Sequence, residues 1–132
     1  MEGSVKIPSD MSNIYRAEQL VDLISVKLEI ADELYGNILV CVVEAVSNAI
    51  QHGNDNDVTK IVCLKYSYKN NKLTFTISDE GNGFDLDKVP DPTLPENVEN
   101  IKGRGIFLIN HLSDELKFEN GGSVINIGFN IK

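Results

Sequence analysis

The 132-residue sequence has no tryptophan, only two cysteines, and 12 basic residues against 20 acidic ones. The net charge of −8 argues against a phosphate-backbone or anionic-membrane partner, because clustered lysine and arginine bind those surfaces. The longest dense apolar run, residues 38–43, is too short to span a bilayer, and the first ten residues lack the features of a signal peptide. We therefore predict a cytoplasmic protein that contacts neither nucleic acid nor membrane directly.

The two cysteines, Cys41 and Cys63, each lie inside an apolar segment. This placement predicts buried, reduced thiols rather than a disulfide. The two histidines, His52 and His111, do not lie at a close ligand spacing with the cysteines, so the sequence does not predict a zinc site.

Apolar residues make up 42% of the chain, which is enough for one core, and we predict a single domain over residues 1–132. Helical spacing predicts helices over 12–30, over 32–52 and from about 103–105 onward. Alternation predicts a short strand over 3–7 and two hairpins, 59–69 with 72–79 and 115–119 with 123–131. The expected fold is a two-layer α/β sandwich of the α+β type, with helices on one face of a mixed, mostly antiparallel sheet.

The segment from Glu80 to Lys102 is rich in glycine and then in proline, and it has no consistent period. An irregular stretch of this length in a compact domain is typical of a functional lid, which we place at about 85–102. A plain disordered insertion is compatible with the same composition.

The second predicted helix carries one polar stripe on an otherwise apolar surface. Glu44, Asn48 and His52 follow one another at steps of four, so they lie on the same face. One interpretation is a solvated edge or an internal hydrogen-bonded pair. The other is a ligand site, in which the asparagine oxygen binds a hard cation and the glutamate orients or deprotonates a nucleophile.

A first glycine motif, Asp79-Glu80-Gly81-Asn82-Gly83, lies where a predicted strand ends. Glycine allows the backbone to approach a ligand without an intervening Cβ, and an aspartate at a strand end can accept from an exocyclic amine. A plain turn is compatible with the same residues.

A second glycine motif, Gly103-Arg104-Gly105, precedes the third predicted helix. The free backbone N–H groups and the dipole of such a helix start favour an anion. A flexible end to the preceding loop is the alternative interpretation.

In this order the motifs resemble the ATP-binding domain of the GHKL superfamily, which includes gyrase-type topoisomerases, heat-shock chaperones, sensor histidine kinases and mismatch-repair proteins. The resemblance covers residues from about Val5 to Ile131 and implies a Bergerat-type ATP-binding fold. Three segments look more specifically like the anti-sigma-factor serine-protein kinases of bacterial partner-switching systems. They are EAVSNAIQHG (44–53), DPTLPEN (91–97) and GRGIFLI (103–109).

The resemblance also implies residue roles. Asn48 would hold Mg²⁺ against the triphosphate of ATP, Glu44 would act as the base on the attacking hydroxyl, and Asp79 would accept from the adenine amino group. The other implied nucleotide-binding positions are Gly81 and Gly83 under the nucleotide, Gly103 and Gly105 along the phosphates, and Ser123 near the adenine. Ser123 departs from the family, which commonly has a threonine there.

Two further side chains keep open interpretations. Arg104 stands at a position that varies widely in the family, and it would pair either with a phosphate or with an acidic neighbour. His52 lies next to the polar stripe, and we expect it to have a structural role at the helix end.

The function implied by the resemblance is that of an ATP-dependent serine-protein kinase and anti-sigma regulatory factor. Its substrate would be a serine on a STAS-type anti-anti-sigma protein, a sigma factor would be a second partner, and the chain would form a homodimer. The alternative is a nucleotide-gated module that sequesters a partner without phosphoryl transfer. The presence of Glu44 favours the kinase, because a protein that only binds has no use for a base.

Overall fold

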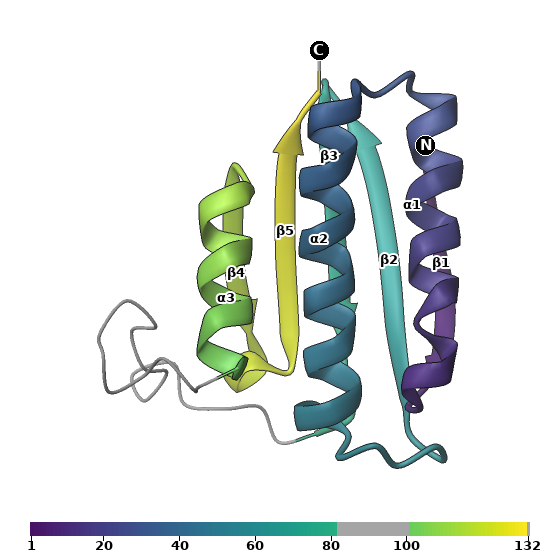
Figure 1. Ribbon diagram of the computed structural model, residues 1–132, viewed down its shortest axis with the longest axis vertical. Helices are drawn as coiled ribbons and strands as arrows, with labels where there is room; N and C mark the ends of the chain where they lie inside the picture. The colour runs from purple at the N-terminus through teal and green to yellow at the C-terminus, as the bar shows by residue number, and fades with distance from the viewer. Residues whose placement is uncertain (82–100, 132) are drawn as a thin grey trace.

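The structure is a computed structural model that describes residues 1–81 and 101–131, with the side chains of the second range described from Gly105 onward. In these ranges three α-helices cover one face of a five-stranded sheet (Figure 1). The strands are β1 (Glu2–Pro8), β2 (Ile61–Lys69), β3 (Lys72–Ser78), β4 (Glu115–Glu119) and β5 (Val124–Asn130). The helices are α1 (Tyr15–Lys27), α2 (Asp32–Asn48) and α3 (Ile101–Leu112). The expected two-layer sandwich is confirmed.

The sheet has the order β1-β2-β3-β5-β4, and every pairing among the described residues is antiparallel. We expected a mixed, mostly antiparallel sheet, and the difference comes from the position of the last hairpin. β4 runs in the same direction as β3, so a β3–β4 neighbour pair would have been parallel. β5 lies between them and pairs antiparallel with both.

Both expected hairpins form, and their turns use the residues that tolerate left-handed backbone. Asn70 and Asn71 have φ angles of 54° and 64°, and they join Lys69 to its partner Lys72. The primed two-residue turn requires positive φ at both central positions, which asparagine accepts. In the second hairpin, Gly121 has a φ of 69°.

The helix expected over residues 12–30 is divided and shorter. A 3₁₀ turn, Met11–Asn13, precedes α1, and the Asp10 carboxylate caps this turn by accepting from the Ser12 N–H at 2.9 Å. That hydrogen bond lowers the pKa of Asp10. α1 ends at Lys27, and Glu29 takes a φ of 52°, which a continuing right-handed helix does not allow.

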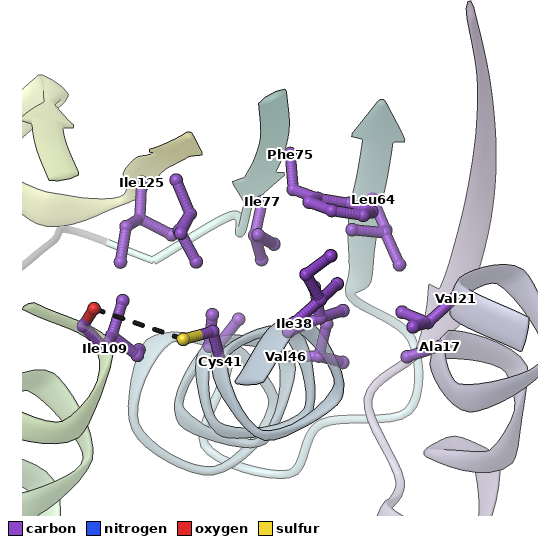
Figure 2. Close-up of a cluster of buried hydrophobic side chains, with 14 of the residues drawn as sticks. Ala17, Val21, Ile38, Cys41, Val46, Leu64, Phe75, Ile77, Ile109 and Ile125 are labelled. Atoms are coloured by element: carbon purple, nitrogen blue, oxygen red, sulfur yellow. Dashed lines mark hydrogen bonds between the residues drawn. The ribbon is translucent and has the colours of Figure 1, made fainter. Parts of the chain in front are cut away.

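α2 crosses the middle of the sheet and supplies much of the core. Its buried side chains are Ile38, Cys41, Val42, Ala45 and Val46. Figure 2 shows several of them facing Leu64, Phe75 and Ile77 of the sheet. With the turn that follows it, this helix (residues 32–53) is long and apolar enough for a membrane span by length and composition. Its packing in the core accounts for that apolar character.

The two thiols differ in their surroundings. Cys41 is buried, its Sγ donates to the Ile109 carbonyl of α3 at 4.0 Å, and burial, with a smaller effect of Glu44, raises its pKa to about 12 (Figure 2). Cys63 is only partly buried, so the expectation of burial is wrong for this residue. Val62 and Leu64 point into the core, and strand alternation therefore directs Cys63 to the opposite face. Both thiols are free, as expected.

Candidate functional site

α2 and β3 end at the same end of the molecule at which α3 and β5 begin (Figure 1). A pocket lined by residues of these four elements lies there. It encloses about 460 Å³ of empty space, a volume that includes open solvent at its mouth. Predicted site residues in its lining are Asn48, Asp79 and Ser123. The rest of the lining is mostly apolar or glycine: Ala45, Ala49, His52, Gly53, Ile77, Ile106, Phe118, Gly122 and Ile125.

At one side of the pocket, Glu44, Asn48 and Gly105 form what we call the helix cluster. Glu44 and Asn48 are both half-buried and lie one turn apart on α2. A Cβ added to Gly105 would lie 3.0 Å from Glu44 Oε2 and 3.1 Å from Asn48 Nδ2. α3 therefore passes closely over the polar stripe of α2, and the structure places Gly105 against two residues that are far from it in the sequence.

At the other side, Gly53, Asn54, Asp79, Glu80 and Gly81 form the strand-end cluster. The Asp79 N–H donates to the Ser123 carbonyl at 2.9 Å, which extends the pairing of β3 with β5 by one residue. The Asp79 Oδ1 atom accepts from the Gly81 N–H at 2.8 Å. The sequence left open whether Asp79 forms a plain turn or belongs to a ligand site. In the structure the two are compatible, because the carboxylate closes the turn and Asp79 also lines the pocket.

Two glycines are required in the strand-end cluster for space. A Cβ on Gly53 would lie 2.3 Å from Asp79 Oδ2, and a Cβ on Gly81 would lie 2.0 Å from the Gly53 carbonyl oxygen. Gly53 ends the helical segment that follows α2, and its φ is not positive. Its role in the structure is to let the Asp79 carboxylate approach the backbone.

α2 does not stop at Asn48 but continues into a π-helical turn, Ala49–Gly53. The Asn54 N–H donates to the Ala49 carbonyl at 2.8 Å, which closes this wider turn. Such turns occur often at functional sites. Here the turn places His52 and Gly53 along the pocket.

Ser123 lies in the turn before β5, where its hydroxyl donates to the Asn120 carbonyl at 3.1 Å and its residue lines the pocket. The sequence suggested that Gly103 and Gly105 precede the third helix. In the structure α3 begins at Ile101, so both glycines lie inside its first turns. Gly83, most of the expected lid (85–102) and the Arg104 side chain lie outside the part of the chain that the structure describes.

Sequence reasoning missed two polar residues beside the site, Ser9 and Asn54, which are fully buried. Asn54 stands in the hydrophilic run HGNDND, whose composition is typical of an exposed loop. Its burial depends on contacts with distant segments, which no local pattern contains.

The helix cluster fits a magnesium ion for which phosphates and water supply most of the ligands. In residues 1–81 and 101–131, no three His, Cys, Asp or Glu side chains come together as a metal cluster. Mg²⁺ is commonly held by one or two protein oxygens plus substrate phosphates. Asn48 lines the pocket, and the missing Cβ of Gly105 leaves room for its amide beside α3.

These features define a small α+β domain, with an antiparallel sheet, three covering helices and a pocket at their common end. A model of the histidine kinase-like ATPase domain matches residues 7–129, and the chain therefore belongs to that family. The expected family is confirmed, and as an ATPase-family domain the chain binds ATP.

Named relatives lie within one group of regulators. The serine-protein kinase RsbW of Oceanobacillus iheyensis is 26% identical over 122 residues, covering 88% of this chain and 77% of the relative. The anti-sigma F factor of Thermoanaerobacter pseudethanolicus is 31% identical over 105 residues, covering 78% and 73%. RsbW of Bacillus subtilis is 28% identical over 96 residues, covering 67% and 59%.

Proposed function

We propose that this chain is an ATP-dependent serine-protein kinase and anti-sigma regulatory factor. The observation that carries the proposal is the helix cluster, in which a carboxylate and an amide lie side by side under Gly105 at one side of the pocket. The names of the relatives, serine-protein kinase and anti-sigma F factor, support the same function.

The proposed reaction is a direct transfer of the γ-phosphoryl group to a serine hydroxyl. The serine oxygen forms a bond to the γ-phosphorus, the bond from that phosphorus to the β–γ bridging oxygen breaks, and ADP leaves. Glu44 accepts the hydroxyl proton. Phosphoryl transfer needs positioning and charge neutralisation more than covalent help from the protein, so one base and a set of donors suffice.

In this proposal, Asn48 would hold a magnesium ion, which would neutralise charge on the triphosphate. The backbone N–H groups at the start of α3 would donate to phosphate oxygens, as the start of a helix favours anions. Gly103 and Gly105 would allow the phosphates to approach the helix, and Arg104 would supply one positive charge.

The strand-end cluster would bind the base of ATP. Asp79 would accept from the adenine amino group, with Gly81 and Gly83 under the nucleotide and Ser123 at the adenine edge. The apolar walls of the pocket, including Ile77, Ile106 and Ile125, would cover the faces of the ring.

The partner would be a STAS-type anti-anti-sigma protein that carries the target serine. A sigma factor would be the second partner, and the active form would be a homodimer in the bacterial cytoplasm.

The test is incubation of the protein with ATP labelled at the γ-phosphate and with STAS proteins from the same genome. Label should move to one of them and should disappear when the target serine is replaced by alanine. A tight nucleotide-dependent complex without any labelled partner would instead identify a binding module that sequesters its partner.

A further inference from the structure

Two polar residues near the pocket are buried although they are not part of its lining. Ser9 and Asn54 are each 0% exposed, although neither lines the pocket. Buried polar side chains cost free energy unless they are hydrogen-bonded, so their contacts indicate what they hold in place.

Asn54 connects three segments that are distant in the sequence. Its Oδ1 atom accepts from the Glu80 N–H at 2.8 Å, and its Nδ2 atom donates to Ser9 Oγ at 2.9 Å. The Ser9 hydroxyl in turn donates to the Lys60 carbonyl at 2.7 Å. The side chain thus joins the end of β1, the loop before β2 and the turn after β3.

The bond to Glu80 matters because it acts on the peptide group directly after Asp79. The peptide group before Asp79 is held by the bond from its N–H to the Ser123 carbonyl at 2.9 Å. With Asn54 holding the next N–H, the peptide groups on both sides of the Asp79 Cα atom are fixed. The direction of the Asp79 side chain from the backbone is therefore fixed as well.

We propose that Asn54 is a positioning residue for base recognition, which sets the orientation of the Asp79 carboxylate through the Glu80 peptide. The inference rests on the proposed role of Asp79 as the acceptor for the adenine amine. Asn54 itself does not contact the nucleotide in this proposal.

A second contact shows that the same turn is held from another side. The Glu80 carboxylate accepts a hydrogen bond from the Ile61 N–H at the start of β2. This bond holds the side chain of Glu80, whereas Asn54 holds its backbone. Removal of Asn54 should therefore release the peptide group without unfolding the turn, which makes the proposal testable in a folded protein.

The experiment compares wild-type protein with Asn54→Ala and with Val21→Ala. Val21 is a fully buried core residue on α1, so its variant is a control that is destabilised without touching the turn. Each protein is titrated by calorimetry with ATP and with inosine triphosphate, which has a carbonyl in place of the adenine amine. Circular dichroism and thermal unfolding measure folding and stability.

We expect wild-type protein and Val21→Ala to prefer ATP by about tenfold or more, and Asn54→Ala to lose most of that preference. Asn54→Ala that keeps the wild-type preference would overturn the inference while leaving the role of Asp79 intact. Wild-type protein without any preference would overturn both.

A measurement that needs no nucleotide completes the test. Amide hydrogen exchange is followed by NMR, and in each variant the exchange rate of the Glu80 N–H is compared with the rates of the core strands. Relative to those strands, the Glu80 N–H should exchange markedly faster in Asn54→Ala than in Val21→Ala. Equal protection of Glu80 in the two variants would show that Asn54 does not hold this peptide group, and the proposal would then be wrong.

Discussion

The two sides of the pocket are built in different ways. In the strand-end cluster, three hydrogen bonds fix Asp79 and its neighbours: the Asp79 N–H donates to the Ser123 carbonyl, the Gly81 N–H donates to the Asp79 carboxylate, and the Glu80 N–H donates to the Asn54 side chain. In the helix cluster, Glu44 and Asn48 are set by the pitch of α2 and by the close passage of Gly105. Within the described ranges, no hydrogen bond holds either of these two side chains.

The difference matches the two tasks in the proposed function. Recognition of a base needs an acceptor in a fixed direction before the ligand arrives, because a misplaced carboxylate loses its hydrogen bond. A base and a metal ligand must instead adjust to phosphate and hydroxyl groups that are complete only when substrates are bound. We therefore expect substitutions in the helix cluster to change transfer rates, and those in the strand-end cluster to change nucleotide affinity and selectivity.

The largest effect is expected for Glu44→Gln. Glutamine has the same shape but cannot accept the hydroxyl proton, so the transfer rate to the partner should fall by roughly 10²–10⁴-fold while ATP affinity stays close to wild type. Single-turnover transfer of labelled phosphate and calorimetric titration measure the two quantities. Glu33→Gln, an exposed change in the first turn of α2, is the matched control. An unchanged transfer rate in Glu44→Gln would contradict the role of this residue as the base.

Asp79→Asn should change selectivity instead of rate. Asparagine can still accept from the Gly81 N–H and close the turn, but the charge-assisted bond to an adenine amine becomes a neutral one. Wild-type protein should bind ATP at least roughly tenfold more tightly than GTP, and the variant should lose affinity for ATP. Calorimetry with both nucleotides measures this effect.

The control for Asp79→Asn is Asp55→Asn, since Asp55 is exposed and has a φ of 52°, which asparagine tolerates. If Asp79→Asn binds ATP as tightly as Asp55→Asn does, the carboxylate serves only the turn.

Asn48→Ala tests the proposed metal-binding role of the helix cluster. In the proposed function Asn48 holds the metal ion, so this variant should reduce the strengthening of ATP binding by magnesium several-fold, toward the affinity measured in EDTA. The exposed Asn110 on α3 offers a control, Asn110→Ala. Should magnesium strengthen ATP binding equally in both variants, Asn48 has a structural role.

The sequence predicts the helix cluster better than the strand-end cluster, for a physical reason. Glu44 and Asn48 lie one turn apart on one helix, so a local period brings them together. The contact of Gly53 with Asp79 and the hydrogen bond from Glu80 to Asn54 each join residues 26 apart in the chain. Such contacts depend on how α2 ends against the sheet, including a π-helical turn that no spacing rule predicts.

Element boundaries show the same limit. The turn at Asn70-Asn71 was predictable because its backbone requirement is local. The start of α3 at Ile101 was not predictable, because the low helix propensity of Gly103 and Gly105 indicates a helix that begins after them. Gly105 is tolerated there because its missing Cβ makes room for Glu44 and Asn48.

The smallest effects are expected for two glycine substitutions that can be compared directly. Gly36 and Gly105 both lie within helices, and neither has a positive φ, so alanine should gain the same helix propensity at each, about 0.5–1 kcal/mol. A Cβ on Gly36 would meet nothing within 4 Å, whereas one on Gly105 would touch Glu44 and Asn48. Gly36→Ala should therefore raise the free energy of unfolding by that amount and leave phosphate transfer unchanged.

Gly105→Ala should show little or none of that gain, because its Cβ forces the Glu44 and Asn48 side chains to move by a few tenths of an ångström. The same movement should lower the transfer rate several-fold, since small misplacements of catalytic groups reduce rates. Denaturant unfolding and single-turnover transfer, measured on both variants, separate the two effects. If both variants gain stability and keep the wild-type rate, α3 does not constrain the helix cluster, and the two sides of the pocket would differ less than their contacts indicate.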